Sequence, residues 1–391
     1  MRIFISTGEV SGDLQGSLLI QALQRLAEER GVSLELVALG GNLMAQTGAT
    51  LLANTAEIGS VGLSESLRFL WPTWQIQQRV KAYLKKQPVD LMILIDYMGP
   101  NVAIASYIRQ QFPDIPILYY IAPQAWIWSP TAGNIRQLVN ITDRLLAIFP
   151  GEADFFRSQG VNVTWVGHPL LDRIAQAPSR AEARQQLGID PDQLMVTLLP
   201  ASRVQELTYL LPVICAAAQK LQQTLPHLQF YLPISLEAYR QRIEETVKAY
   251  GLQVTFLPGL TLAAIAAADL AITKSGTVNL EIALLNVPQV ILYRVSPFTM
   301  FIARRLFRFD IPFVSPPNIV MERKIVPELL QEAATPDRIY QESLKLLQEP
   351  ALRQKLQQDY QQLRTTLGEV GVCDRAAQEI FQFLADRSTH K

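Results

Sequence analysis

Short apolar segments alternate along the chain with longer segments whose apolar residues recur at helical spacing. This alternation is typical of parallel sheets covered by helices. In the first half it predicts strands near residues 2–6, 34–39, 91–95, 117–121 and 144–149. In the second half it predicts strands near residues 194–199, 228–232, 253–256, 270–273 and 289–293. The pattern therefore predicts an α/β fold with two domains of the same kind.

A domain junction is expected where the pattern restarts. The tripeptide Gly167-His168-Pro169 suits a turn, and Pro178 discourages a helix that runs through this part of the chain. The last part of the chain is mostly helical in pattern, including the Gln- and Leu-rich segment 337–367. A length of 391 residues fits two or three domains. We expect an N-terminal domain over 1–170, a second domain over 171–365 and a C-terminal helix over 366–391.

Composition narrows the function classes. Hydrophobic residues make up 49% of the chain, yet no apolar run reaches the ~18 residues of a membrane span. Met1 leads almost directly into the first strand without a signal-peptide pattern, so we expect a cytoplasmic protein. The 35 basic and 35 acidic residues balance, which gives no support for nucleic-acid binding. Cys215 and Cys373 lie far from each other and from any histidine, so we expect no disulfide and no metal site.

The first strand leads into a glycine-rich turn at residues 8–16. Its glycines are four residues apart, a spacing that differs from that of a dinucleotide-binding loop. Glu9 and Asp13 would also place carboxylates where a pyrophosphate should lie. The turn therefore suits a neutral group such as a sugar, with Glu9 and Ser11 as candidate contacts. The alternative is a tight turn with Asp13 in the first turn of a helix.

A carboxylate ends the third clear strand of the first half. Asp96 follows five apolar residues, so it would lie at the rim of the sheet with limited water, where a carboxylate can act as a general base. A plain Asx turn is the alternative. Asn101 follows as a candidate cap of the next helix and as a candidate contact to a bound sugar.

The next strand continues into an aromatic segment over residues 119–128. These side chains, beside Gln124, can wall a carbohydrate site or pack in a core. His168 is one of three histidines, and it either bonds a ligand between the domains or ties the interdomain turn together. Gln124 and His168 are therefore further candidate contacts to a bound sugar.

Two strand ends of the second half suggest an anion site. After the strand near 194–199, Ser202 would cap the coming helix and Arg203 could hold a diphosphate through paired hydrogen bonds. No metal cluster accompanies these residues. A second loop, which follows a later strand of the same half, supports the interpretation as an anion site.

This second loop is a turn of hydroxyl-bearing residues around Gly276. Ser275 and Thr277 can cap the helix that follows, and the amides and dipole at such a helix start suit a phosphate. Glu281 lies four residues after Thr277, on the same side of the helix, and could reach the hydroxyls of a sugar. The alternative is an ordinary capped helix with a solvent-facing Glu281. Together the two loops predict a nucleotide-diphosphate site.

An interfacial surface is predicted over residues 63–86. Phe69, Trp71 and Trp74 are followed closely by four basic residues, a combination that can dip into lipid headgroups. The alternative is that these aromatic side chains pack in the core. A second apolar segment, 298–308, carries three arginines and is a similar candidate.

Several segments resemble those of lipid-A-disaccharide synthases, the inverting glycosyltransferases of the lipopolysaccharide pathway, and the resemblance runs nearly end to end. It rests on residues 8–13, 95–96, 167–170, 198–203, 275–281, 293–299, 317–318 and 326–331. Each segment alone is a modest signal, but their order along the chain is specific. This sequence departs from the family pattern at Ala201, where Gly is usual, and at 321–323, where the family has two small residues and an Arg.

The resemblance implies a glycosyltransferase B fold, in which two Rossmann-like domains face each other across a cleft. It places the acceptor and the acyl chains in the N-terminal half and the uridine nucleotide in the C-terminal half. The implied donor is UDP-2,3-diacylglucosamine and the implied acceptor is 2,3-diacylglucosamine 1-phosphate. The products are a β(1→6)-linked disaccharide 1-phosphate and UDP, and no cofactor is implied.

The resemblance also implies an assembly. The final helices cross back to the N-terminal half or to a partner subunit, and homodimers exchange their C-terminal segments. Because both substrates carry acyl chains, the protein must reach a membrane surface without spanning it. We expect peripheral association with the inner membrane through Phe69, Trp71 and Trp74.

Under this hypothesis Asp96 accepts the proton of the acceptor's 6-hydroxyl as that oxygen attacks the donor's anomeric carbon in a single inverting displacement. Arg203 and the turn at 275–277 would stabilise the charge of the leaving UDP. Glu281 would hold the ribose hydroxyls, and Asn318 would contact the nucleotide.

Two other functions fit the same sequence features. A sugar-nucleotide 2-epimerase would share the fold and the UDP site but would need neither an acceptor nor a surface for acyl chains. A non-catalytic nucleotide-sugar binding protein could keep Arg203 and Glu281 without needing Asp96. Incubation with both acylated substrates separates the three, since only the transferase yields a disaccharide.

Overall fold

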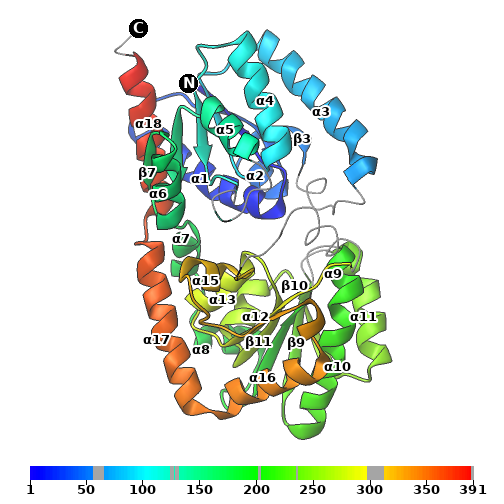
Figure 1. Ribbon diagram of the computed structural model, residues 1–391. Coiled ribbons are helices and arrows are strands. Elements are labelled where there is room, and N and C mark those ends of the chain that lie inside the picture. Colours follow the sequence, from blue (N-terminus) through cyan, green and yellow to red (C-terminus); the bar gives the residue numbers. More distant parts are fainter. Residues whose placement is uncertain are drawn as a thin grey trace. The chain divides into compact units, whose positions relative to one another are not determined.

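The structure is a computed structural model that describes residues 1–55, 66–123, 127, 132–200, 204–234, 237–296 and 312–388. The chain divides into two compact units (Figure 1). Unit 1 contains Met1–Asp172 and Leu367–Lys391, and unit 2 contains Arg173–Thr366. The boundaries expected from the sequence, 170 and 365, fall two residues and one residue before the ends of these segments.

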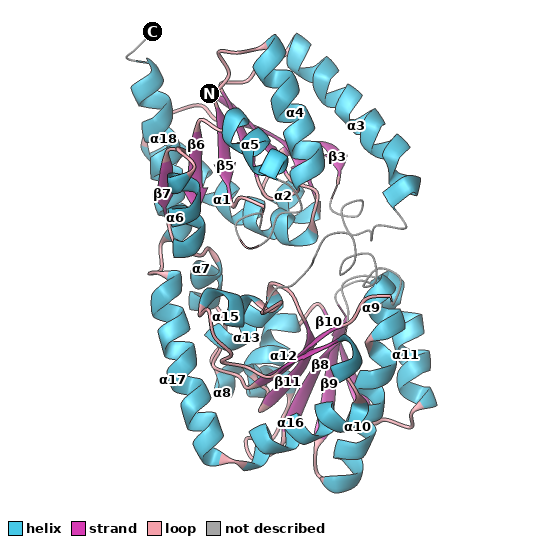
Figure 2. Ribbon diagram, in the orientation of Figure 1, coloured by secondary structure: helices cyan, strands magenta, loops and turns pink. Residues whose placement is uncertain are grey.

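Unit 1 is built on a parallel sheet of seven strands (Figure 2). In sheet order they are β3 (Thr50–Asn54), β2 (Glu35–Gly40), β1 (Arg2–Ser6), β4 (Leu91–Leu94), β5 (Ile117–Tyr120), β6 (Arg144–Ala147) and β7 (Val163–Trp165). The strand order runs outward in both directions from the neighbours β1 and β4, which makes this pair the topological switch point. Ligands of open α/β sheets bind at the carboxyl ends of the strands on either side of such a point.

Helices cover both faces of this sheet. They are α1 (Val10–Glu29), α2 (Asn42–Gln46), α3 (Ser66–Lys86), α4 (Met98–Gln111), α5 (Ala132–Ile141), α6 (Pro150–Ser158) and α18 (Val372–Ser388), and α7 (Leu170–Ala175) lies at the boundary with unit 2. Because both faces are covered, the central strands β1, β4 and β5 are almost wholly apolar and buried.

Unit 2 repeats the plan with six parallel strands. In sheet order they are β10 (Val254–Pro258), β9 (Gln229–Ile234), β8 (Met195–Leu199), β11 (Leu270–Lys274), β12 (Gln289–Tyr293) and β13 (Glu328–Leu330). The switch point lies between β8 and β11. The described helices are α8 (Arg180–Leu187), α9 (Val204–Tyr209), α10 (Leu211–Thr224), α11 (Arg240–Ala249), α12 (Thr261–Ala266), α13 (Val278–Leu284), α15 (Pro316–Val320), α16 (Pro336–Gln348) and α17 (Pro350–Leu367).

The C-terminal helix returns to the first half of its own chain. Figure 1 shows α18, in red, alongside unit 1, where it packs on α1. Arg25 forms an ion pair with Asp374 at 2.6 Å, and the guanidinium of Arg30 lies 5.2 Å from the ring centre of Phe381. The predicted α/β fold of two parallel-sheet domains with a returning C-terminal helix is confirmed.

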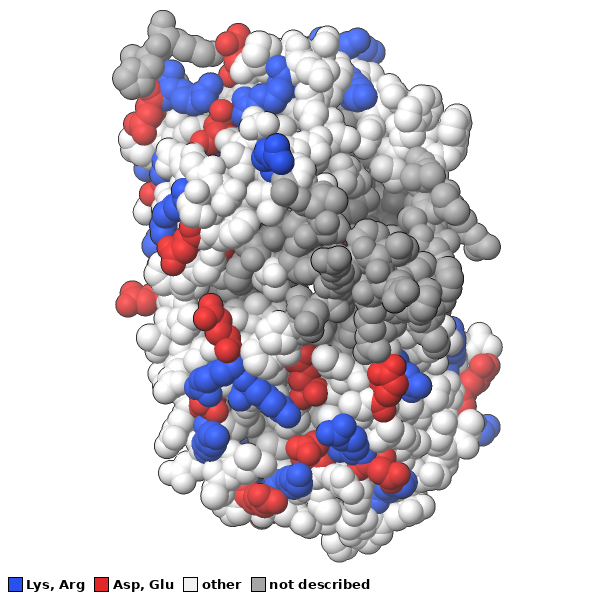
Figure 3. Space-filling view, in the orientation of Figure 1, with Lys and Arg blue, Asp and Glu red and all other residues white. Residues whose placement is uncertain are grey.

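Three strands were not predicted, namely β3, β7 and β13, and each lies at the edge of its sheet. β7 and β13 have only three residues each, and β3 and β7 contain no buried residue. Edge strands of this kind lack the apolar runs that identify central strands. Among the described residues no helix is long and apolar enough to cross a membrane. On the face drawn in Figure 3, acidic and basic side chains are interspersed.

Candidate active site

Asp96 lies directly beyond the carboxyl end of β4, at the switch point of unit 1. Both Asp96 and the following Tyr97 adopt left-handed backbone conformations, with φ of 45° and 50°. The amide of Asp96 donates to the carbonyl of Ile121 at 2.9 Å, which ties this turn to the end of β5. Strained backbone of this kind clusters at functional sites because the surrounding structure must hold it in place.

Asn101 is the brace of this turn. Its side chain is fully buried and accepts from the hydroxyl of Ser6 at 2.7 Å through Oδ1. Its Nδ2 donates to the carbonyls of Asp96, Ile95 and Ser6 at 2.8, 3.2 and 3.2 Å. The amide group is therefore directed inward, toward the ends of β1 and β4. This placement favours a positioning role for Asn101 over the expected contact to a sugar.

The turn after β1 lies against the turn after β4. A Cβ atom added at Gly8 would come within 2.1 Å of the Tyr97 ring, so glycine is required for this close approach. Burial raises the pKa of Tyr97, and the nearby carboxylate of Glu9 raises it further. Glu9 and Ser11 are both half-buried. Of the two, Glu9 lies near Tyr97.

Asp13 has a different role from its neighbour Glu9. Its carboxylate is buried and accepts from the amides of Gly41, Leu43 and Met44 at 2.8, 3.0 and 3.0 Å. These amides lie at the start of α2, so Asp13 caps a neighbouring helix and is directed away from the cradle that the sequence suggested.

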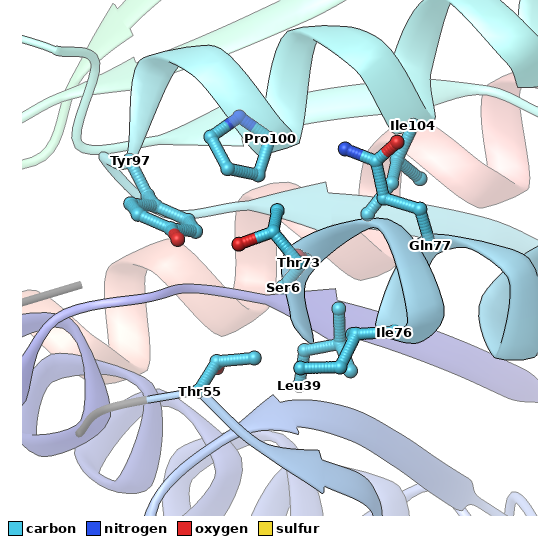
Figure 4. Close-up of a pocket in the computed structure, with 9 residues that line it drawn as sticks. All are labelled: Ser6, Leu39, Thr55, Thr73, Ile76, Gln77, Tyr97, Pro100 and Ile104. Carbon is cyan, nitrogen blue, oxygen red and sulfur yellow. The ribbon is translucent and has the colours of Figure 1, made fainter. Parts of the chain in front are cut away.

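An apolar pocket lies beside Tyr97 (Figure 4). Its walls come from the ends of β1 and β2, from α3 and from the start of α4. Tyr97 and Pro100 face Thr73 across it in the close-up. The full lining is Ser6, Leu39, Thr55, Thr73, Ile76, Gln77, Tyr97, Pro100 and Ile104.

The same helix α3 carries two tryptophans on another side. Trp71 and Trp74 are 64% and 50% exposed, and their rings stack with centres 5.0 Å apart. This exposure contradicts the alternative of core packing for these two side chains. Lys81, further along α3, lies 5.0 Å from the ring centre of Tyr107.

Other members of the predicted sugar site face inward. His168 is buried, and its Nδ1 accepts from the amide of Leu170 at 3.2 Å, while its own amide donates to Leu367 at 2.9 Å. Burial lowers the pKa of His168 to about 3, so the ring is neutral at physiological pH. Of the two alternatives, the structure favours a ring that fastens its own turn and the returning chain. Tyr119 and Tyr120 are core residues, not a sugar wall.

In unit 2 the predicted phosphate turn follows β11, at the switch point. The hydroxyl of Ser275 donates to the carbonyl of Val314 at 3.1 Å, and the amide of Gly276 donates to Oδ1 of Asn279 at 2.7 Å. Asn279 is fully buried and its Nδ2 donates to the carbonyl of Lys274 at 3.0 Å. Neither Ser275 nor Thr277 caps α13 as the sequence suggested, because Asn279 locks the turn instead.

Lys274 adds a cation to this turn. A Cβ atom added at Gly276 would lie 2.8 Å from Nζ of Lys274, so the ammonium group rests directly against the glycine. The same Nζ lies 3.7 Å from Oε1 of Glu206 on α9. Sequence reasoning assigned no role to Lys274 or Asn279. The sequence positions of both residues could have indicated these roles. Lys274 lies one residue before the turn, and Asn279 lies three residues after Gly276.

Glu281 is buried and forms an ion pair with Arg173, with 3.2 Å between Oε1 and Nη1. Burial raises the pKa of Glu281, and Arg173 acts in the opposite direction. The alternative of a solvent-facing Glu281 is therefore wrong. Its expected contact to ribose stays a prediction.

Asn318 is fully buried within the segment before β13. Its Oδ1 accepts from the amides of Ile325 and Val326 at 2.8 and 3.0 Å, and its Nδ2 donates to Glu328 at 2.9 Å. Glu328 in turn accepts from the amide of Val314, whose carbonyl meets Ser275. Asn318 thus supports the nucleotide turn from behind, and this placement does not favour the expected direct contact.

Some predicted residues lie outside the described part of the chain. They are Gln124, Trp126, Trp128, Ser202, Arg203, the side chain of Phe69 and the segment 298–308. Within the described residues no group of three or more His, Cys, Asp and Glu side chains could hold a metal ion.

Two parallel sheets, each with loops gathered at a switch point, define the glycosyltransferase B class of fold. The fold is similar to that of the UDP-GlcNAc 2-epimerase from Neisseria meningitidis bound to UDP-GlcNAc, with a TM-score of 0.66 and 13% identity over 99% of this chain and 100% of that one. It is also similar to Anabaena Alr3699/HepE in complex with UDP and glucose, with a TM-score of 0.58 and 16% identity over 97% and 99%. At these identities the likeness concerns the fold alone.

The family follows from the sequence comparisons. A family described as lipid-A-disaccharide synthetase matches residues 3–383. The chain is 66% identical to the lipid-A-disaccharide synthase of Synechocystis sp., over 98% of each chain. Identity to that of Gloeothece citriformis is 60% over 98% of this chain and 100% of the relative, and to that of Geobacter sulfurreducens 36% over 98% and 97%. The chain belongs to the lipid-A-disaccharide synthase family and is a glycosyltransferase of lipid A biosynthesis, as predicted.

Proposed function

We propose that this protein transfers the diacylglucosaminyl group of UDP-2,3-diacylglucosamine to the 6-hydroxyl of 2,3-diacylglucosamine 1-phosphate. The products are the β(1→6)-linked disaccharide 1-phosphate and UDP. The observation that carries the proposal is the half-buried Asp96 at the switch point of unit 1, in a left-handed turn braced by Asn101, in a chain of this family. A general base of glycosyl transfer needs this kind of fixed placement.

The proposed chemistry is a single inverting displacement. The acceptor oxygen forms a bond to the anomeric carbon while the bond between that carbon and the UDP oxygen breaks. The proton of the attacking hydroxyl passes to the carboxylate of Asp96 and then to solvent. Inversion follows because attack and departure take place on opposite faces of the same carbon.

Unit 2 would hold the leaving group. Arg203, Ser202 and the turn at 275–277 bind the diphosphate, and the cation of Lys274 attracts the negative charge that this group already carries in the bound donor. Glu281 binds the ribose, and its ion pair with Arg173 orients the carboxylate. Asn318 shapes this site through Glu328 and Val314.

The acceptor would be held in unit 1. Glu9, Ser11 and Gln124 are its proposed polar contacts, while Asn101 and His168 hold the turns that carry such contacts. The apolar pocket between α3 and α4 is too small for an acyl chain, since its free volume of about 10 Å³ has room for roughly one water molecule.

Peripheral membrane contact is proposed on the cytoplasmic side of the inner membrane. The proposal rests on Trp71 and Trp74, which are exposed and stacked on each other. Tryptophan side chains are enriched at the headgroup level of membranes. A homodimer with exchanged C-terminal segments is also proposed, in which α18 would make its contacts with α1 of the partner. Light scattering on the purified protein measures the mass that decides whether it is a dimer.

The test of function is incubation of the purified protein with both acylated substrates, followed by mass spectrometry of the lipid product and assay of UDP. Disaccharide and UDP in equal amounts support the proposal. An altered UDP-sugar without acceptor would identify an epimerase, and unchanged substrates would identify a binding protein.

A further inference from the structure

Glu152 joins the ends of two strands in unit 1. It lies in the first turn of α6, and its side chain is fully buried. One carboxylate oxygen accepts from the amide of Ala122 at 2.8 Å, two residues after the end of β5. The other accepts from the amides of Ile148 and Phe149 at 2.8 and 3.2 Å, directly after β6. A buried carboxylate is costly unless it is hydrogen-bonded, so these three bonds hold it in one position.

The backbone next to the carboxylate of Glu152 is strained at one residue. Ile121 adopts a left-handed conformation with φ of 66°, which is unfavourable for a β-branched side chain. Its amide donates to Leu146 at 3.2 Å, and the next amide along the chain, that of Ala122, is bound by Glu152. The turn is therefore held from both sides, as strained backbone requires.

The strained turn at 121–122 is hydrogen-bonded to the backbone of Asp96. The carbonyl of Ile121 accepts the amide of Asp96 at 2.9 Å. A continuous path of bonds thus runs from Glu152 through Ala122 and Ile121 to the backbone of Asp96. The two carboxylates are also close enough for the charge of Asp96 to raise the pKa of Glu152, after the larger effect of burial.

We propose that Glu152 is a positioning residue for glycosyl transfer, which sets the placement of Asp96 by holding the turn at 121–122. This inference rests on the proposed function of Asp96 as general base. Because the side chain of Glu152 is fully buried, we expect it to make no contact with a substrate. Its loss should therefore lower turnover and leave nucleotide binding in unit 2 unchanged.

Asp143 offers a matched control at the other end of the same two strands. It directly precedes β6, and its carboxylate accepts from the amide of Ile117 at the start of β5 at 2.7 Å. Both Glu152 and Asp143 thus join β5 to β6, but only Glu152 does so beside Asp96. Asp143→Asn keeps one acceptor for this bond but removes the charge that pairs with Arg109 at 2.6 Å, so it disturbs the join between the two strands one strand length away from the site.

The experiment compares Glu152→Gln, Glu152→Asp and Asp143→Asn with the wild type. The glutamine keeps the length but replaces one acceptor by an amide donor, and the aspartate keeps the charge but is too short for all three bonds. Because small misplacements of a catalytic group are costly, we expect both Glu152 variants to lose about 10- to 100-fold in kcat, with UDP affinity unchanged. Asp143→Asn should keep the wild-type kcat, and thermal unfolding measures stability in all four proteins.

A folded Glu152→Gln or Glu152→Asp protein with wild-type kcat overturns the inference, and so does an equal loss of kcat in Asp143→Asn. Glu152→Asp serves if the glutamine variant does not fold. Failure of the wild type to form disaccharide would be a different result, since it would refute the proposed function and not the positioning role alone.

Discussion

The turn after β4 in unit 1 and the turn after β11 in unit 2 occupy equivalent places in two similar sheets, yet they are held in different ways. The first contains the left-handed residues Asp96 and Tyr97 and is braced by Asn101, which reaches β1 at Ser6. The second is locked by the nearby Asn279. One turn presents an acid on strained backbone, and the other presents a cation on relaxed backbone.

The difference follows from what each turn is proposed to do. A general base must lie at one place relative to the reacting oxygen, whereas a cation stabilises a diphosphate over a wider range of positions. Left-handed residues cost of order 1–3 kcal/mol each. The amide of Asn101 has two N–H groups and one acceptor in use, and at about 1 kcal/mol for each of these its hydrogen bonds offset part of this strain.

The largest effect is expected at Asp96. Asp96→Asn keeps the shape of the side chain but cannot accept the proton, so turnover should fall by about 10²- to 10⁴-fold. UDP affinity should not change, because the nucleotide binds in unit 2. Single-turnover kinetics with both acylated substrates measures the first quantity and calorimetry with UDP the second. A similar loss of UDP affinity would break the proposed division between the two turns.

The second effect concerns pH and the buried acid behind the first turn. Burial raises the pKa of Glu152 to about 7, so the folded protein keeps this proton to higher pH than the unfolded chain, whose carboxyl titrates near 4.5. The contribution of Glu152 to the unfolding free energy should therefore fall as pH rises from about 4.5 to 7, by up to roughly 3 kcal/mol. The buried, neutral His168 acts in the opposite direction, so the effect is measured as the difference between wild type and variant. Denaturant unfolding of wild type and Glu152→Gln at both pH values tests this, since the variant should gain relative stability at the higher pH. An equal difference at both values would contradict it.

The variant Asn101→Ala removes the brace of the first turn and leaves the carboxylate of Asp96 in place. Asn101→Ala deletes the amide that bonds Asp96, Ile95 and Ser6, so the protein should lose about 1–3 kcal/mol of stability. Turnover should fall by about 10- to 100-fold because Asp96 is no longer fixed. Thermal unfolding and kcat are the measurements. Lost stability with unchanged kcat would show that the strain at Asp96 is not needed for catalysis.

The fourth prediction addresses the cation of unit 2. Lys274→Gln should weaken UDP binding by about tenfold, the value of one hydrogen bond to a charged group, and change kcat less than Asn101→Ala does. Lys248, exposed on α11, is the matched control, since Lys248→Gln removes an equal charge from the same unit. Equal affinities in the two variants would remove Lys274 from the nucleotide site.

The smallest effect on catalysis is expected at the exposed tryptophans. Trp71→Ser with Trp74→Ser should lower binding to vesicles that contain anionic lipid and leave UDP affinity unchanged, because the pair lies on the surface of α3. Trp165→Ser is the control, since this tryptophan of β7 is also exposed, at 40%. Flotation of vesicles measures binding. Wild-type binding by the double variant would count against this surface.

The sequence pattern predicted the central strands and the strand ends that carry the candidate site, because covered parallel strands are continuous apolar runs. It did not predict which way the side chains of the loops face. Asn101 and Asn318 carry amide groups that suit a ligand, but partners such as Ser6, 95 residues away, direct them inward. Glu152 resembled an ordinary acid in the first turn of a helix, and only the fold brings the ends of β5 and β6 to its carboxylate.

The central claim is that the two turns divide the work between proton transfer and nucleotide binding. Turnover and UDP affinity measured together in Asp96→Asn and Lys274→Gln test it most directly. We predict that Asp96→Asn loses turnover with wild-type UDP affinity, and that Lys274→Gln loses UDP affinity with most of its turnover at saturating donor. Near-normal turnover in a folded Asp96→Asn protein would contradict the account.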